Sequence, residues 1–176
     1  MTRELFGTIT AGAAAGAAGT TALNAVTYLD MVLRGRPESE LPRRAVETAA
    51  EKAGLDIPGE GAQRENRIRA LAAWSGLATG VGLGVAAALS RRVLHRNGRL
   101  PLTASAVLTG AAAMAAADVP MAVGGLTDPR SWSLPDWLSD VVPHLAYGVV
   151  TAWTLRAIDP LPGEGKPACF SPVCTG

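Results

Sequence analysis

Four long apolar stretches alternate with polar connections along this 176-residue chain. The apolar stretches cover about residues 5–33, 70–90, 101–125 and 137–158. Each is long enough to cross the hydrocarbon core of a bilayer, which needs roughly 20 helical residues. The pattern predicts an all-α fold, an integral membrane bundle of four transmembrane helices within a single domain of residues 1–158.

A cleaved signal peptide is the competing interpretation of the first stretch, because Arg3 precedes an apolar segment rich in Ala-x-Ala sites. The stretch is longer than the apolar core of a typical signal peptide, and further apolar stretches follow it. We therefore expect it to remain as the first span.

The first connection, residues 34–69, is polar and contains the signal of a short amphipathic helix. Pro42 lies near the start of this predicted helix, and Gly54 lies just past its end. Proline is common at the start of helices and glycine just after their end. A thin apolar stripe runs along it, formed by Val46, Ala49, Ala50 and Ala53. Two interpretations stay open: the helix lies on the membrane surface or covers the end of the bundle, or it is a solvated helix within a loop.

The composition fits a membrane protein better than a soluble one. Apolar residues make up 48% of the chain, but only 5% of residues are aromatic, and Ala and Gly dominate the apolar stretches. A soluble core needs larger side chains to fill its volume, whereas small residues let membrane helices approach closely. The net charge of +1 favours no nucleic-acid partner, and the Pro- and Gly-rich residues 159–176 predict a disordered tail.

Two sets of glycines predict helix–helix contacts. In the first predicted span, Gly12, Gly16 and Gly19 share one helical face. In the second, a glycine recurs at every fourth residue, at Gly76, Gly80 and Gly84. Small residues at such spacings let another helix approach closely. We favour another helix of this chain as the partner, with a second copy as the alternative.

Among the polar residues of the predicted spans, six lie near the ends that face the connection at residues 34–69: Asn24, Thr27, Asp30, Asp118, Asp140 and His144. The first and third spans finish on the side where the fourth begins, so these residues share one leaflet in either orientation. Charges near the bilayer centre cost roughly 2.5–3.5 kcal/mol and are usually paired or face water. We predict a polar intramembrane pocket, with Arg34 as a further partner of Asp30 one helical turn away.

Asp118 and His144 are the strongest candidates for functional residues of this pocket, because a hairpin of the third and fourth spans places them at similar depth in the membrane. Pro120 and Pro143 lie one or two residues away, and each removes a backbone hydrogen-bond donor. In the functional interpretation the pair binds a proton, an ion or a polar headgroup. In the structural interpretation a hydrogen bond locks the hairpin, or the helix ends lie nearer the membrane surface.

The chain contains no motif of soluble-enzyme chemistry: no P-loop, G-x-S-x-G, H-E-x-x-H or C-x-x-C sequence. His95 and His144 are the only histidines, so a histidine-rich metal site is not expected. Cys169 and Cys174 lie in the tail, where we expect free thiols, with a local disulfide or a shared metal site as alternatives. We predict no catalytic residue, metal or cofactor.

Four spans place both termini on the same side of the membrane. The short connection at residues 91–99 lies on that side and carries four arginines and no acid. The opposite side has more basic residues, but they are spread among acids over the longer connection at residues 34–69. Because a compact arginine cluster is hard to translocate, we favour cytoplasmic termini, and the orientation stays open.

The segments GTTALNAVTYLDMVLRGRP, LTGAAAMAAADVPMAVGGLTDPRSW and LSDVVPHLAYGVVT resemble small four-helix membrane proteins of high-GC actinobacteria. No activity is assigned to proteins of that kind. The resemblance covers most of residues 5–157 and excludes the cysteine-bearing tail. It implies a multi-pass protein of the bacterial plasma membrane and nothing chemical.

These observations favour a non-enzymatic helper or structural subunit that packs against partner helices. The expected partners are the lipid bilayer and either another membrane protein or a second copy of the chain. A small transporter or permeation unit that uses Asp118 and His144 to handle protons or ions is the first alternative. A lipid-processing enzyme is the second, and it is weaker because only one acid–histidine pair is available as general acid and base.

Overall fold

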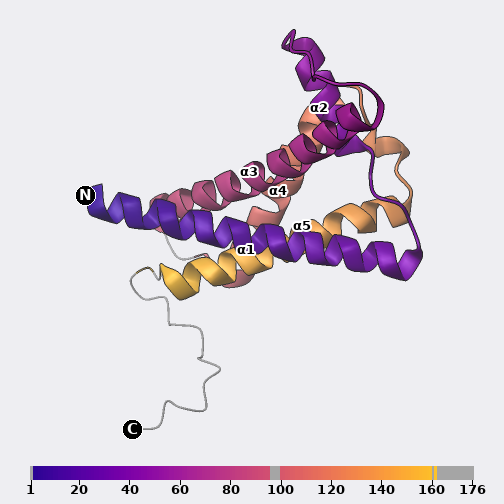
Figure 1. The fold of residues 1–176 in the computed structure, drawn as a ribbon. Helices are drawn as coiled ribbons and strands as arrows, with labels where there is room; N and C mark the ends of the chain where they lie inside the picture. Colours follow the sequence, from indigo (N-terminus) through magenta and orange to yellow (C-terminus); the bar gives the residue numbers. More distant parts are fainter. Residues whose placement is uncertain (1, 96–99, 160, 162–176) are drawn as a thin grey trace.

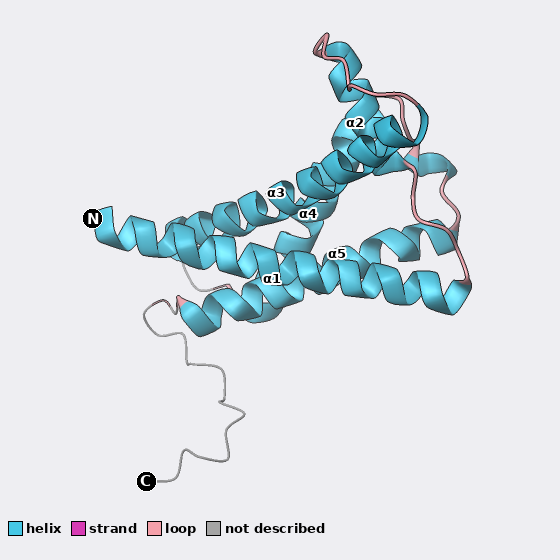
Figure 2. Ribbon diagram, viewed as in Figure 1, coloured by secondary structure: helices cyan, strands magenta, loops and turns pink. Residues whose placement is uncertain are grey.

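The computed structural model describes residues 2–95, 100–159 and 161, and it confirms the predicted all-α fold. Within these residues there is no strand, and most of them belong to helices (Figures 1 and 2). The elements in chain order are α1 (Thr2–Arg34), α2 (Leu41–Lys52), α3 (Gly61–His95), α4 (Leu102–Val123), the single 3-10 turn η1 (Pro129–Ser131) and α5 (Leu134–Ile158). Of the predicted tail, residues 159–176, all but Asp159 and Leu161 lie outside the described residues, including both cysteines.

Two of the described helices are long and apolar enough to cross a membrane: Gly61–Leu94 within α3, and α4. Helix α3 begins well before the apolar stretch expected at about residue 70, because the polar lead-in is built from good helix formers such as Gln63, Arg64 and Glu65. Helix α4 ends at Val123, and the chain turns at Gly125, whose φ of +71° favours glycine.

The helices pack in the spatial order α3, α1, α5, α4, and each neighbour in that order is antiparallel to the next. Helix α1 lies between α3 and α5, and α5 lies between α1 and α4, while α3 and α4 contact each other little. The N-terminal end of α1 and the C-terminal end of α5 lie at the same end of the bundle (Figure 1). At that end Arg92 of α3 forms an ion pair of 3.0 Å with Asp159, the residue that follows α5. This pair links the C-terminal ends of α3 and α5.

The contact between α1 and α3 joins backbone to backbone. A Cβ built on Gly16 would lie 2.5 Å from the carbonyl oxygen of Gly80, and one on Gly12 would lie 2.6 Å from the Cα of Val85. A Cβ on Gly84 would in turn meet the backbone of Gly16. Since ordinary contacts of a Cβ are 3.4–4 Å, these glycines set how closely the two helices approach.

The other two predicted packing glycines behave differently from each other. Gly19 faces α5, where a Cβ would lie 2.8 Å from the ring of Tyr147. A Cβ on Gly76 would meet nothing within 4 Å, so Gly76 does not contact another helix among the described residues. A close contact between α4 and α5 was not predicted from the sequence. There Gly110 lies against the carbonyl oxygen of His144, and Gly148 lies against Gly110.

Small residues and one tyrosine fill the centre of the bundle. Ala15 and Ala88 are buried, and Tyr147 of α5 is only 1% exposed. The hydroxyl of Tyr147 donates a hydrogen bond of 2.7 Å to the carbonyl oxygen of Gly80. Leu155 of α5 is the large aliphatic side chain that joins them, at 2% exposed, whereas many other large apolar side chains point outward, as Trp74 and Val123 do.

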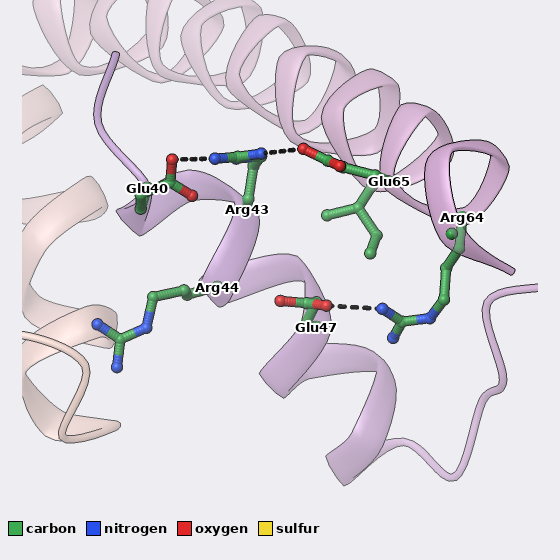
Figure 3. A pocket seen from close by; sticks show the side chains of 8 residues that line it. Glu40, Arg43, Arg44, Glu47, Arg64 and Glu65 are labelled. Atoms are coloured by element: carbon green, nitrogen blue, oxygen red, sulfur yellow. Dashed lines mark hydrogen bonds and ion pairs between the residues drawn. The ribbon is translucent and has the colours of Figure 1, made fainter. Parts of the chain in front are cut away.

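The predicted short helix is present as α2, with Pro42 at its start and Gly54, at a φ of +65°, just past its end. It packs against the first turns of α3 through two ion pairs, both at 2.8 Å (Figure 3). These join Arg43 to Glu65 and Glu47 to Arg64. Arg43 also pairs with Glu40, and the hydrogen bond that it donates there raises the pKa of Arg43.

Candidate functional site

The candidate site lies where the end of α4 and the start of α5 meet, and an ordered turn joins the two helices. Asp128 accepts a hydrogen bond of 3.0 Å from the backbone N–H of Arg130, which starts the 3-10 turn. The rings of Trp132 and Trp137 pack edge to face, with centroids 5.0 Å apart. The indole N–H of Trp132 donates to Thr127 at 2.9 Å. The turn therefore fixes how α5 leaves α4.

A capping box begins α5. The Ser133 side chain accepts a hydrogen bond from the backbone N–H of Asp136, and the Asp136 carboxylate accepts one of 2.9 Å from the backbone N–H of Ser133. The hydrogen bonds that Ser133 donates to this carboxylate, from its side chain and its backbone, hold the pKa of Asp136 below its ordinary value of 3.8. The helix start is thereby set nearly two turns before Asp140.

Asp140 and His144 are in polar contact one helical turn apart on α5. The Nδ1 atom of His144 lies 3.2 Å from the Oδ1 atom of Asp140 and 2.8 Å from the Asp140 carbonyl oxygen. Both neighbours accept hydrogen bonds, so Nδ1 carries a proton and donates it. The second ring nitrogen, Nε2, is then the atom at which His144 gains or loses a proton.

Asp118 joins this pair from α4 through Asp140. The carboxyl groups of Asp118 and Asp140 lie within hydrogen-bonding reach of each other. Two carboxyl groups in such contact form a hydrogen bond only when a proton lies between them. The Oδ2 atom of each is buried and has no hydrogen-bond partner in the described part of the chain. Asp140 therefore interacts with both of the residues that the sequence pattern paired directly.

Asp30 belongs to a second polar cluster beside the first. Its carboxylate accepts hydrogen bonds from Arg36 at 2.5 Å and from the hydroxyl of Ser139 at 3.2 Å, and Arg34 lies 3.4 Å away. Arg34 also donates to the carbonyl oxygen of Pro135 at 3.2 Å. These bonds tie the end of α1 to the start of α5, next to Asp140.

Asn24 and Thr27 take part in neither cluster. Asn24 is exposed and Thr27 is half-buried on α1. Across the described residues, no hydrogen bond links either of them to the acids or to His144. The structure thus brings together Asp118, Asp140 and His144, places Asp30 on an adjoining α1–α5 contact, and leaves the two uncharged residues apart.

Sequence reasoning missed two polar residues that organise this region, Arg36 and Ser139, and also the buried Tyr147 at the centre of the bundle. A signal existed for Tyr147, because it follows His144 by three residues and so lies on the same side of α5. Ser139 directly precedes Asp140 but projects toward α1, and only the position of α1 reveals its role. Arg36 lies beyond the end of α1, where sequence periodicity gives no direction.

The chemistry available to the cluster is the binding and transfer of protons. Among the described residues, no group of three or more His, Cys, Asp and Glu side chains is arranged to hold a metal ion. Two facing carboxyl groups and one imidazole exchange protons without a metal. Comparison of the chain with protein-family models, curated proteins and solved structures finds no match.

Proposed function

We propose that this chain is an integral membrane protein that crosses the bilayer four times, through α1, α3, α4 and α5. The observation that carries the proposal is the distribution of side-chain size. Small residues such as Ala15 fill the helix contacts, while Trp74 and Val123 are 72% and 84% exposed. Apolar area left in water costs about 25 cal/mol per Å², whereas lipid tails accommodate such a surface without that cost.

The low burial of α3 and α4 supports a membrane location over two simpler explanations. In their most apolar windows only 11% and 17% of residues are buried. A core helix of a soluble protein is mostly buried, so these helices do not resemble one. A signal sequence lies near the N-terminus, whereas α3 and α4 begin at Gly61 and Leu102.

The packing order supports α1 and α5 as the other two spans. These helices lie between α3 and α4, so a bilayer that encloses the outer pair also encloses the inner pair. At 1.5 Å per residue, α5 is about 38 Å long and α1 about 50 Å, and both lengths exceed the roughly 30 Å of a bilayer core. Their acids and arginines are concentrated near the helix ends or in the clusters described above.

We propose a non-enzymatic role for the protein, as a helper or structural subunit of the bacterial plasma membrane. Gly76 supports a partner helix or a second copy as the binding target. It continues the four-residue spacing of Gly80 and Gly84, yet it faces outward on an exposed apolar helix. A helix from outside the chain can approach closely there.

Thiol accessibility tests the four-span proposal. The tail cysteines report one side, and Glu51→Cys on α2, in a background with both tail cysteines changed to Ser, reports the other. With cytoplasmic termini, we expect Glu51→Cys to react with an impermeant maleimide in intact cells and the tail only after permeabilisation. Reaction of both positions from the same side would contradict four spans, and so would recovery of the protein without detergent.

A second candidate function, proton handling, is favoured by Asp140, which has His144 on one side and Asp118 within hydrogen-bonding reach. The test is pH change inside liposomes that contain the purified protein, with Asp118→Asn and His144→Gln as variants and Asp128→Asn of the same hairpin as the control. Loss of flux in the first two variants only, with unchanged folding, supports proton handling. Reduced thermal stability of these two variants with no flux in the wild type supports a structural cluster instead.

A further inference from the structure

An apolar groove lies between α2, the loop after it and the first half of α3. Its volume is about 580 Å³, within the range of roughly 300–1,000 Å³ typical of small-molecule sites. Its walls come from both helices and the loop, and include Val46, Ala50, Leu55, Ile57, Leu71 and Trp74. Leu55 and Trp74 are 67% and 72% exposed, so large apolar side chains stand open at this groove.

Two groups of opposite charge, Arg67 and Asp56, line the same groove. Both are exposed. The Nη1 atom of Arg67 donates to the carbonyl oxygen of Pro58 at 2.5 Å, which fixes the side chain over the loop. A guanidinium group has five N–H donors, so this bond leaves donors for an anionic ligand. The groove therefore offers a cation and an anion beside an apolar surface.

The position of the groove along α3 matches the boundary between headgroups and acyl chains. Arg67 precedes the apolar part of α3, and Leu71 and Trp74 follow it by about one and two helical turns on the same side. Arg67 and Trp74 are seven residues apart, which is about 10 Å along the helix. Arginine and tryptophan at such positions are typical of membrane interfaces. One turn beyond Trp74 along α3, the apolar side chain of Leu77 is also half exposed.

We propose that this groove binds one membrane phospholipid whose headgroup carries both a phosphate and an ammonium group. The phosphate lies on Arg67, the ammonium on Asp56, and an acyl chain lies against Leu71 and Trp74. The proposal rests on the four-span membrane proposal, because it uses the depth of α3 in the bilayer. Arginine binds phosphate through paired hydrogen bonds, and Asp56 distinguishes this headgroup from one that is only anionic.

The test is binding of two phospholipids with identical acyl chains, phosphatidylethanolamine and phosphatidylglycerol, to delipidated protein in detergent, measured by native mass spectrometry. The variants are Arg67→Gln and Asp56→Asn. The controls are Arg69→Gln, whose arginine bonds Glu65 and lies outside the groove lining, and Glu51→Gln on the exposed side of α2. These are charge changes at exposed positions, so we expect all four proteins to fold.

We expect the wild type to bind phosphatidylethanolamine about tenfold more tightly than phosphatidylglycerol. Arg67→Gln should weaken both lipids about tenfold, Asp56→Asn should remove the preference, and both controls should bind as the wild type does. Equal binding of the two lipids by the wild type overturns the proposal, and so does unchanged binding by Arg67→Gln or an equal loss in Arg69→Gln. Recovery of the protein in the soluble fraction without detergent would contradict the membrane proposal before any lipid is added. Failure of the membrane proposal is therefore distinguishable from failure of the lipid-site proposal.

Discussion

The hydroxyl of Tyr147 on α5 donates a hydrogen bond of 2.7 Å to the carbonyl oxygen of Gly80 on α3. The ring of the same tyrosine lies against Gly19 of α1, where a Cβ would come within 2.8 Å. One buried side chain thus contacts α1 and α3 from α5. Its ring leaves no room for a side chain at Gly19, whereas a Cβ on Gly80 would meet the side chain of Thr20 on α1.

Tyr147→Phe should lower the free energy of unfolding by about 0.5–1.5 kcal/mol, the net value of one buried hydrogen bond. The ring stays in place, so the effect reports the hydroxyl alone. Unfolding of the purified protein by heat or denaturant in detergent measures the loss. Tyr28→Phe is the control, because Tyr28 is 59% exposed. An equal loss in both variants would contradict a special role for Tyr147.

Gly84→Ala should destabilise the protein by about 1–3 kcal/mol, as overpacking of a close contact does. The added methyl group meets the backbone of Gly16, which cannot rotate away. Gly76→Ala is the matched control on the same helix and should be neutral or stabilise by up to about 1 kcal/mol, because Ala favours helix more than Gly does. A melting temperature that falls in the control as far as in Gly84→Ala would show that α3 needs glycine for another reason.

Asp140 should couple energetically to both of its neighbours, whereas Asp118 and His144 should couple weakly to each other. Asp140→Asn combined with His144→Gln should deviate from additivity by about 0.5–3 kcal/mol. Asp118→Asn combined with His144→Gln should deviate less, because among the described residues Asp118 interacts with His144 electrostatically and without a hydrogen bond. The two double-mutant cycles are measured by denaturant unfolding. The reverse order of coupling would restore the direct Asp118–His144 pair.

The capping box of α5 predicts a defined pH dependence. The pKa of Asp136 is held below 3.8 in the folded protein by the hydrogen bonds from Ser133. Its contribution to stability is therefore fully present above the unfolded value and is lost as pH falls through the lower folded value. Asp136→Asn should be less stable than the wild type at pH 7, and the difference should shrink below about pH 4. Thermal unfolding across this range measures it, and a difference that does not change with pH would contradict the prediction.

The helices and most of the close helix–helix contacts could be predicted from the sequence, because both depend on local periodicity. The spacing of Gly12, Gly16, Gly80 and Gly84 indicated where backbones meet, and Pro42 with Gly54 bounded α2 correctly. Apolar patterning did not locate the start of α3, because polar helix formers continue the helix without an apolar face.

The candidate site was only partly visible for a different reason. Asp118, Asp140 and His144 stand out as polar residues within apolar helices, so composition alone selects them. Their order in space depends on the rotation of α5 against α4, which Gly110 and Gly148 set through backbone contact. Asn24 and Thr27 share the same end of the bundle yet face elsewhere, and no short-range pattern separates them from Asp30.

The backbone contact between α1 and α3 also restricts how this protein evolves. In a contact between two side chains, a larger residue on one side is offset by a smaller residue on the other. At Gly16 and Gly84 the opposing atoms belong to the main chain, which no substitution makes smaller. A second substitution in the partner helix therefore cannot make room for a larger residue at either position. In a deep mutational scan these positions should stay intolerant in every sequence background, and the distance between α1 and α3 should be inherited almost unchanged.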